Sequence, residues 1–234
     1  MVLAKDEKFA DKEEDLGLEV QIRTKLVRYW SYIKVAAIRI GDDILEVEGG
    51  PESATWWFNF EPHGELATIG DFPVTRKVKS EWKQFFEIDL SSKYPGQKIV
   101  LSTYKEFVRV DFENGTEESF GNTKGLLGNF TTGETLARDG KTVMDDFWEY
   151  GKEWQVRQFE NLLFHESSEP QFPERCIQPD SPRGKRLRRR RLEKMTVTES
   201  EAETACSHLK DPLDRKDCVY DIIATQDLDM VGAY

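Results

Sequence analysis

Short segments in which apolar and polar residues alternate are the feature that most constrains how this chain can fold. Leu18 to Arg23 alternates with a period of two, and Phe107 to Phe112 does so again. Such alternation puts every second side chain on one face of a β-strand, as a sheet with one buried face requires. Segments of this kind recur at intervals of about ten residues, separated by Gly, Pro, Asn or Asp and without helical periodicity. They predict a mainly β fold, an antiparallel β-sandwich.

The predicted strands form one continuous body at residues 17–157. They cover residues 18–23, 33–40, 44–47, 55–60, 65–69, 72–78, 85–90, 98–104 and 106–112. Six Trp, seven Tyr and 14 Phe support a β-rich core, because aromatic side chains favour pleated, half-buried surfaces. Residues 1–16 are mostly charged, and we expect them to be a disordered lead-in.

Residues 196–226 change to a helical pattern. Thr198 and Glu201 make a capping-box sequence, and the apolar residues that follow recur at the spacing of one helix face. Asp211 followed by Pro212 suits the start of a second helix. The sequence therefore predicts a small C-terminal α-helical hairpin, with a short tail at residues 227–234.

The cysteine positions separate this hairpin from the body. Cys176, Cys206 and Cys218 all lie in the last third of the chain, so the β-rich body has to be stable without disulfides. Cys206 and Cys218 each fall on the apolar face of a predicted helix, and a tight turn brings these faces together. We expect a Cys206–Cys218 disulfide, with Cys176 free or paired outside this chain. The alternative is three reduced thiols in a cytosolic protein.

Residues 158–195 read as a linker that is rich in Pro and Ser and ends in a basic run, Arg183 to Arg191. Three interpretations of the run stay open: a solvated linker, a site where a secretory-pathway convertase cuts after basic residues, or a nuclear-localisation or polyanion patch. Cleavage would fall after Arg186 or Arg191.

Charge and hydropathy exclude two classes of partner. Seven of the 33 basic residues lie in the basic run, so the rest of the chain has 26 basic and 44 acidic residues, a net charge of −18. Such a surface repels nucleic acid and anionic membranes. No apolar run approaches the roughly 20 residues of a membrane span, and the N-terminus lacks the apolar core of a secretory signal.

The stretch from Lys124 to Trp154 combines close-packed glycines with aromatic residues. Gly125 and Gly128 flank two leucines, as expected where the backbone packs too closely to its neighbours for a β-carbon. We expect Leu126 and Leu127 to form an interior β element. The large apolar residues expected in the core beside them are Phe130, Phe147, Trp148 and Trp154.

In order and spacing this stretch resembles the von Willebrand factor type D domain. The family carries Cys-Gly-Leu-Cys-Gly-Asn-Phe/Tyr, an Asp-Gly and a Phe/Tyr-Gly-x-x-Trp ending. The corresponding residues here are Lys124-Gly125-Leu126-Leu127-Gly128-Asn129-Phe130, Asp139-Gly140 and Tyr150-Gly151-Lys152-Glu153-Trp154. Both family cysteines are replaced, by Lys124 and Leu127, and the family's N-terminal Gly-Asp-Pro-His strand is not found.

The resemblance covers roughly residues 17–157 and implies an extracellular, secreted module that acts in adhesion or matrix assembly. It implies other extracellular proteins or glycans as partners, and a larger chain whose secretory signal has been lost or lies upstream. The helical tail resembles a reduced form of the cysteine-rich C8 module that follows type D domains.

The same resemblance implies a calcium site in the loop after the glycines. Asn129 matches a family ligand. Together with the carboxylates of Glu134 and Asp139 it could form an incomplete site for calcium, an ion that binds oxygen ligands. The alternative is a polar turn in which Asp139 and Gly140 reverse the chain. Two sequons begin at Asn114 and Asn129, and we expect Asn114, in a turn, to be the glycosylated residue.

No arrangement of residues predicts catalysis. His63, His165 and His208 are scattered along the chain, and no phosphate-binding glycine motif precedes a helix. We expect a non-enzymatic protein. The alternative function is a lectin-like, carbohydrate-binding sandwich in which exposed aromatics among Trp56, Trp57 and Trp82 stack on sugar rings, although packing in the core or the sheets is the preferred explanation of these residues.

Overall fold

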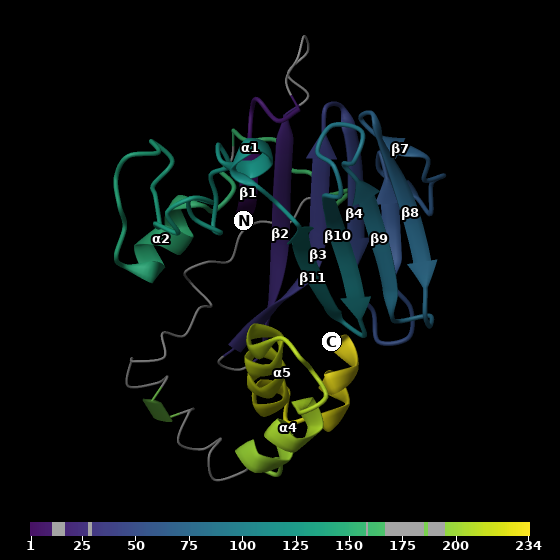
Figure 1. Ribbon diagram of the computed structural model, residues 1–234, viewed down its shortest axis with the longest axis vertical. Helices are drawn as coiled ribbons and strands as arrows, with labels where there is room; N and C mark the ends of the chain where they lie inside the picture. The colour runs from purple at the N-terminus through teal and green to yellow at the C-terminus, as the bar shows by residue number, and fades with distance from the viewer. Residues whose placement is uncertain (11–16, 28–29, 158, 167–184, 187–194) are drawn as a thin grey trace. The chain divides into compact units, whose positions relative to one another are not determined.

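A computed structural model shows the fold, and it describes residues 1–10, 17–27, 30–157, 159–166, 185–186 and 195–234 (Figure 1). The chain divides into two compact units. The first comprises Met1–Lys25 and Tyr32–Glu174, and the second comprises Leu26–Ser31 and Arg175–Tyr234. None of the described helices has both the length and the apolar character needed to cross a bilayer.

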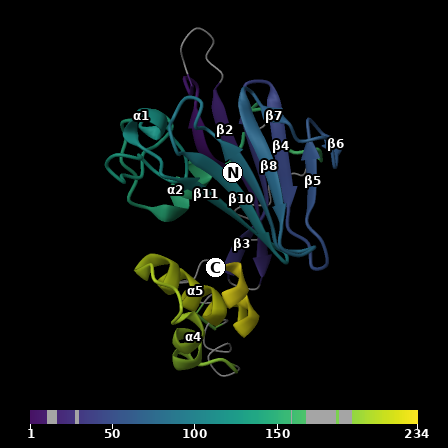
Figure 2. The same cartoon turned by 45° about the vertical axis from the view of Figure 1, so that its right-hand side comes forward.

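Two antiparallel sheets make up the β-rich part of the chain (Figures 1 and 2). The six-stranded sheet runs in sequence order: β1 (Val2–Asp6), β2 (Leu18–Val27), β3 (Trp30–Ile40), β4 (Asp43–Glu48), β5 (Thr55–Phe58) and β6 (Glu61–Pro62). The five-stranded sheet also follows the chain: β7 (Thr68–Ile69), β8 (Phe72–Val78), β9 (Gln84–Asp89), β10 (Lys98–Tyr104) and β11 (Phe107–Glu113). The mainly β class is confirmed, and the short turns explain why neighbours in sequence pair in each sheet.

The core lies between the two sheets, where the alternating residues place it. Ile38 and Leu45 from the six-stranded sheet and Phe86, Ile88 and Leu101 from the five-stranded sheet are fully buried in one cluster. In β9 burial alternates residue by residue, as the period of two predicts. Apolar burial of this extent stabilises the body without a covalent cross-link.

The prediction of a disordered lead-in over residues 1–16 is wrong for the part that the structure describes. Val2 to Asp6 forms β1, which pairs with β2 along Leu18 to Gln21. Phe9 is 1% exposed, and its ring lies between 5.7 and 6.1 Å from three other aromatic rings of the core. Val2, Leu3 and Ala4 are all buried, so β1 is covered on both faces and lacks the alternation by which the other strands are found.

Two short helices lie beside the sheets. These are α1 (Glu117–Phe120) and α2 (Phe147–Glu153). Asp146 caps α2, because its carboxylate accepts hydrogen bonds from the amides of Trp148, at 2.8 Å, and Glu149, at 3.1 Å.

The C-terminal helices form the predicted hairpin. The hairpin consists of α4 (Glu199–Cys206) and α5 (Pro212–Thr225), and the segment predicted as a tail forms the 3₁₀ helix η1 (Leu228–Ala233). Both predicted starts are confirmed. Thr198 and Glu201 cap α4 reciprocally, and the Asp211 carboxylate accepts the amide of Leu213 at 2.7 Å.

Candidate functional site

The glycine-rich stretch is held against strand β1 by main-chain hydrogen bonds. Lys124 and Lys5 exchange two of them, at 2.7 and 2.8 Å, and the amide of Leu126 donates to the carbonyl of Val2 at 3.2 Å. Gly125 has a φ of +154°, and a β-carbon there would lie 2.2 Å from the Leu3 carbonyl oxygen. The predicted close approach of the backbone is therefore confirmed at Gly125, where only glycine fits.

The prediction that Leu126 and Leu127 form an interior β element is wrong. The two residues lie in a turn, where Leu126 is half-buried and packs against two core clusters, and Leu127 is 58% exposed. Gly128, with a φ of +79°, turns the chain directly after them. In such a tight turn successive side chains point in different directions, so only one of the two leucines reaches the core.

The aromatic residues after the glycines divide in the same way. Phe130 is 44% exposed and Phe147 is 78% exposed, so the expectation that they belong to the core is wrong. Trp154 is buried, and Tyr150 joins it in a second cluster with Val2. Helix α2 explains the difference between Phe147 and Tyr150, because one face of a short surface helix points to solvent, whereas Phe130 lies in a turn.

Tyr150 and Trp154 connect α2 to the turn and to β1. The Tyr150 hydroxyl donates to the Gly125 carbonyl at 2.5 Å, and the Val2 amide donates to the Trp154 carbonyl at 2.8 Å. The Trp154 indole N–H donates to the Leu136 carbonyl at 3.0 Å. Burial raises the pKa of the Tyr150 phenol, which keeps it a hydrogen-bond donor. We call this set of contacts among β1, residues 124–127 and α2 the glycine weld.

The three predicted calcium ligands lie in two separate turns of the loop. The Asn129 side-chain oxygen accepts hydrogen bonds from the amides of Thr131 and Thr132, both at 2.9 Å. The Glu134 carboxylate accepts the Thr132 hydroxyl at 2.9 Å. Asn129 and Glu134 thus share one turn, in which neighbouring residues donate hydrogen bonds to Asn129 Oδ1 and to Glu134 Oε2.

Asp139 closes the second turn. Its carboxylate accepts the Thr142 amide at 2.9 Å, the Thr142 hydroxyl at 2.7 Å and the Lys141 amide at 2.8 Å, which together lower its pKa to about 2. Across the described part of the chain, no group of three or more His, Cys, Asp or Glu side chains is placed to hold a metal ion. Calcium binding at Asn129, Glu134 and Asp139 stays a prediction that a calorimetric titration tests.

The two sequons differ in how their asparagines are used. Asn114 is exposed in the turn after β11 with a φ of 54°, and its side chain donates to the Gly96 carbonyl at 3.0 Å. Asn129 is half-buried and closes its own turn, as described above. Exposure favours Asn114 as the acceptor, and its glycosylation stays a prediction.

The tryptophans of the lectin-like alternative are engaged in packing to different degrees. The Arg76 guanidinium lies 3.9 Å from the centroid of Trp56, and His165 stacks on Trp57 at 3.8 Å between ring centroids. Trp82 is half-buried and meets Tyr104 edge-on at 5.0 Å. Sugar stacking is therefore disfavoured at Trp56 and Trp57, each of which has a cation or a ring on its face.

Residues 159–166, assigned from the sequence to the linker, pack on the outer face of the six-stranded sheet. Leu163 and Phe164 are buried against Val35 and Ala37 of β3. The buried Gln21 side chain donates to the Asn161 carbonyl at 2.8 Å and accepts the Leu163 amide at 3.2 Å. We call residues 159–166 the strap.

The end of the strap is held by a buried carboxylate. Glu46 is 1% exposed, and it accepts the His165 amide at 2.7 Å and lies 3.1 Å from the His165 ring nitrogen Nδ1. Burial raises the pKa of Glu46, while the contacts with His165 oppose that rise. Three contacts fix His165: its ring stacks on Trp57, and its ring nitrogen and its amide both contact the Glu46 carboxylate. Glu46 and His165 therefore hold the end of the strap on the sheet.

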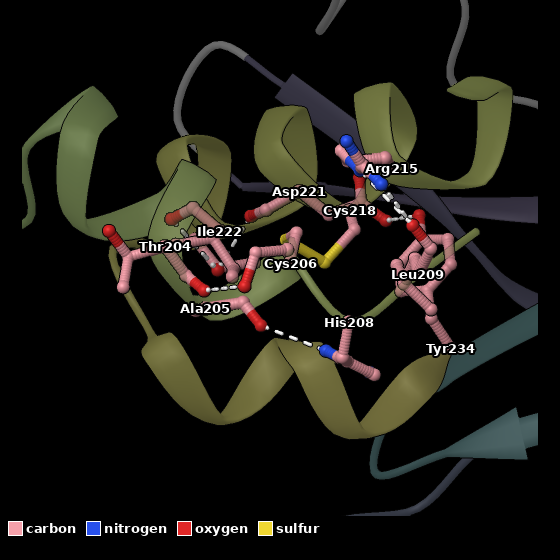
Figure 3. The surroundings of a disulfide bond; sticks show 12 residues. Thr204, Ala205, Cys206, His208, Leu209, Arg215, Cys218, Asp221, Ile222 and Tyr234 are labelled. Carbon is pink, nitrogen blue, oxygen red and sulfur yellow. Dashed lines mark hydrogen bonds between the residues drawn. A yellow bond between two sulfur atoms is a disulfide. The ribbon is translucent and has the colours of Figure 1, made fainter. Parts of the chain in front are cut away.

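The predicted disulfide is present in the helical hairpin (Figure 3). Cys206 and Cys218 are fully buried, lie 12 residues apart and have Cα atoms 6.1 Å apart. Beside them Arg215 donates to the Leu209 carbonyl and so closes the turn between α4 and α5. The bridge joins the two helices to each other.

Two predictions fall wholly or partly outside the described residues. Cys176 and Arg191 are not described. Arg186 is exposed, as an accessible cleavage site requires, and cleavage after Arg186 or Arg191 stays a prediction.

No known family model matches this sequence, and a search of curated proteins gives no match. The type D resemblance therefore depends on the stretch from Lys124 to Trp154. What the described residues of that stretch do is structural: the glycine weld fixes a turn and a helix to β1.

Proposed function

We propose that this chain is a non-enzymatic extracellular module of von Willebrand factor type D character, acting in adhesion or matrix assembly. The observation that carries the proposal is the glycine weld. Gly125, Tyr150 and Trp154 are all positions of the family signature, and each has a packing or hydrogen-bonding role that depends on its residue type. A signature used in this way suits a scaffold that presents its surface to partners.

The helical hairpin supports an oxidising compartment. A buried disulfide between two short helices persists outside the cell and is reduced by the thiols of the cytosol. Other extracellular proteins or glycans are the partners that this setting provides. The acidic character of the chain outside the basic run disfavours nucleic acid as an alternative.

Two measurements on the native material test the proposal. Antibodies against the body should label intact, unpermeabilised cells or their matrix. Protein from the same material, denatured without reductant and treated with a maleimide, should carry no label on Cys206 or Cys218, and prior reduction should expose both. Labelling of permeabilised cells alone, together with three reactive thiols, would contradict the proposal.

A further inference from the structure

Each of the two sheets has two edge strands, and β11 differs from the other three (Figure 1). β6 and β7 have only two residues each, and the edge of β1 is hydrogen-bonded to residues 124–127. β11 has seven residues, pairs with β10 without a register shift and contains neither proline nor lysine. Short strands, covering segments, bulges, proline and lysine are the features that protect sheet edges from other chains. Among the described residues, no main-chain hydrogen bond from another segment reaches the outer edge of β11.

The hydrogen bonds of the neighbouring strands show which residues of β11 direct their main chain to this edge. The Leu90 amide donates to the carbonyl of Gln97, just before β10, at 3.0 Å, so the odd-numbered residues along β10 bond to β9. The two sides of an antiparallel ladder alternate, so the even-numbered residues of β10 bond to their partners in β11. Those partners are residues 107, 109, 111 and 113. Val108, Val110 and Phe112 therefore direct their amides and carbonyls outward, away from β10.

The side chains of these three residues lie on the core face of the strand. Val108 is buried, and Val110 and Phe112 are partly buried and pack against the core between the sheets. Helix α1 approaches from this face, because the Phe120 ring meets the Phe112 ring edge-on at 5.1 Å between centroids. A strand added beside β11 would pair its open main chain and cover more of Val110 and Phe112.

We propose that β11 pairs with β11 of a second copy of this chain, antiparallel and centred on Val110. In this register Val110 lies opposite the second copy's Val110, and Val108 lies opposite its Phe112. Each of these outward pairs exchanges both of its main-chain hydrogen bonds. The two five-stranded sheets then continue into each other. Because the same strand is used on both sides of a two-fold axis, the contact is self-complementary and closes as a dimer.

The charges on the other face of β11 select this register. Arg109 and Asp111 lie on that face, and within one chain the Arg109 Nε lies 2.7 Å from the Asp111 Oδ1. With Val110 at the centre, Arg109 of each copy lies opposite Asp111 of the other, in the pairs where cross-strand side chains are closest. A centre one residue away puts Arg109 opposite Arg109 or Asp111 opposite Asp111, and like charges directly opposite each other are destabilising.

The in-chain contact of Arg109 with Asp111 does not have to break. The four charges alternate in sign around the two-fold axis, so each one has an opposite charge beside it in its own strand and another across the interface. Charged residues usually protect an edge strand from pairing. Those of β11 repel most strands but match a second copy of themselves, which is why the second copy is the partner we propose.

The inference concerns assembly and goes beyond the function proposed above, on which it does not depend. Sedimentation equilibrium of the full chain tests it. The Cys206–Cys218 disulfide is kept intact, and free thiols are alkylated so that Cys176 cannot link two copies. We expect an equilibrium between monomer and dimer, without larger species, because the only open edge is used in the dimer.

Two charge variants test the register. Arg109→Asp and Asp111→Arg should each weaken the dimer about tenfold or more, because both cross-strand pairs change from attraction to repulsion. An equimolar mixture of the two variants should dimerise about as strongly as the wild type. In the mixed dimer both Asp side chains of one chain lie opposite both Arg side chains of the other. No other placement of these residues predicts loss in each variant and recovery in their mixture.

Val110→Pro tests the main-chain bonds. The Val110 amide points away from β10, so proline is tolerated at this edge position of the monomer but removes a donor at the centre of the dimer. We expect this variant to be monomeric. Lys152→Asp is the matched control, because Lys152 forms an exposed ion pair with Glu149 on α2, and it should dimerise like the wild type. Tryptophan fluorescence melting of each variant checks that the fold is retained.

A wild-type chain that stays monomeric up to its solubility limit would overturn the inference and leave the edge to a strand of another protein. A dimer that Arg109→Asp and Val110→Pro leave unchanged would also overturn it, since the contact would then use a different surface. A mixture of the charge variants that fails to dimerise would refute the Val110-centred register. None of these results would affect the surface labelling and thiol measurements that test the proposed location.

Discussion

Replacing Gly125 by alanine tests the glycine weld directly. The new β-carbon would lie 2.2 Å from the Leu3 carbonyl oxygen and 2.6 Å from its carbonyl carbon, so strand β1 or the turn has to move. At a φ of +154°, backbone strain for a residue with a β-carbon costs about 1–3 kcal/mol. Overpacking against the main chain of β1 costs about a further 1–3 kcal/mol. We expect Gly125→Ala to lower the free energy of unfolding of the body by about 2–6 kcal/mol.

Gly133 provides the matched control. It has a φ of +70°, and a β-carbon there meets no atom within 4 Å, so Gly133→Ala adds strain without a clash. That strain is worth about 1–2 kcal/mol. Urea unfolding followed by tryptophan fluorescence measures both variants mainly on the body, because five of the six tryptophans lie in the first unit.

The difference between the two variants is the decisive quantity. A stability of about 5–15 kcal/mol is usual for a domain, so the expected loss at Gly125 moves the urea midpoint well beyond experimental error. If Gly125→Ala costs no more than Gly133→Ala, the turn is not held against β1 and the reasoning from the glycine weld is refuted. An unchanged slope with urea concentration would show that both variants unfold from the same compact state.

Three further predictions concern other parts of the chain. Replacing both Cys206 and Cys218 by Ser should destabilise the hairpin by about 3 kcal/mol, seen as lost far-ultraviolet helical signal, because the closed loop is short; an unchanged signal would contradict it. Leu163→Ala in the strap should cost about 2–5 kcal/mol of body stability and Leu162→Ala much less, since their exposed fractions are 1% and 37%; equal losses would show that the strap is not packed as described. For Asp139, whose folded pKa is lowered to about 2 from 3.8, wild type should be more stable than Asp139→Asn near neutral pH, and this advantage should disappear as the pH falls from 3.8 through 2 in melting experiments; a pH-independent difference would contradict it.

The strands that were predictable from the sequence are those with one buried face. Burial in β9 alternates with the pattern of its residues, and the expected and observed bounds of β8 and β10 coincide. The starts of α4 and α5 were equally predictable, because capping residues act through local hydrogen bonds that depend only on spacing. These features share one property: the sequence neighbours of a residue determine its environment.

The features that were missed depend on contacts between distant segments. β1 has no alternation because Leu3 and Ala4 pack in the core between the sheets while Val2 packs in a separate cluster with Tyr150 and Trp154. Which of Leu126 and Leu127 faces the core depends on the turn geometry, which their composition does not determine. Phe147 is exposed because it lies on the solvent face of α2, a helix that the sequence did not reveal.

The strap was missed because its charged and polar surroundings suggested a linker. The apolar triplet Leu162, Leu163 and Phe164 was a usable signal, since three successive apolar residues are unusual in a solvated segment. The surface of the sheet on which the strap packs was not predictable from the sequence. Gln21 and Glu46 are polar residues on outward positions of their strands, where exposure is the expectation, and only the strap explains why they are buried.

The proposed type D relationship leaves the absence of two cysteines to be explained, and the glycine weld shows how the turn is held without them. At the position of the first family cysteine, the Lys124 main chain exchanges two hydrogen bonds with Lys5, and at the second the Leu127 amide donates to the Leu3 carbonyl at 3.3 Å. A turn that is already fixed by main-chain bonds and by the close contact of Gly125 gains little from a covalent link. The hairpin has no comparable interior, because few of its side chains are buried and the two cysteines are among them. We therefore expect the stability of the body to be independent of redox conditions and that of the hairpin to depend on its disulfide, and the positions of Cys206 and Cys218 follow from that difference.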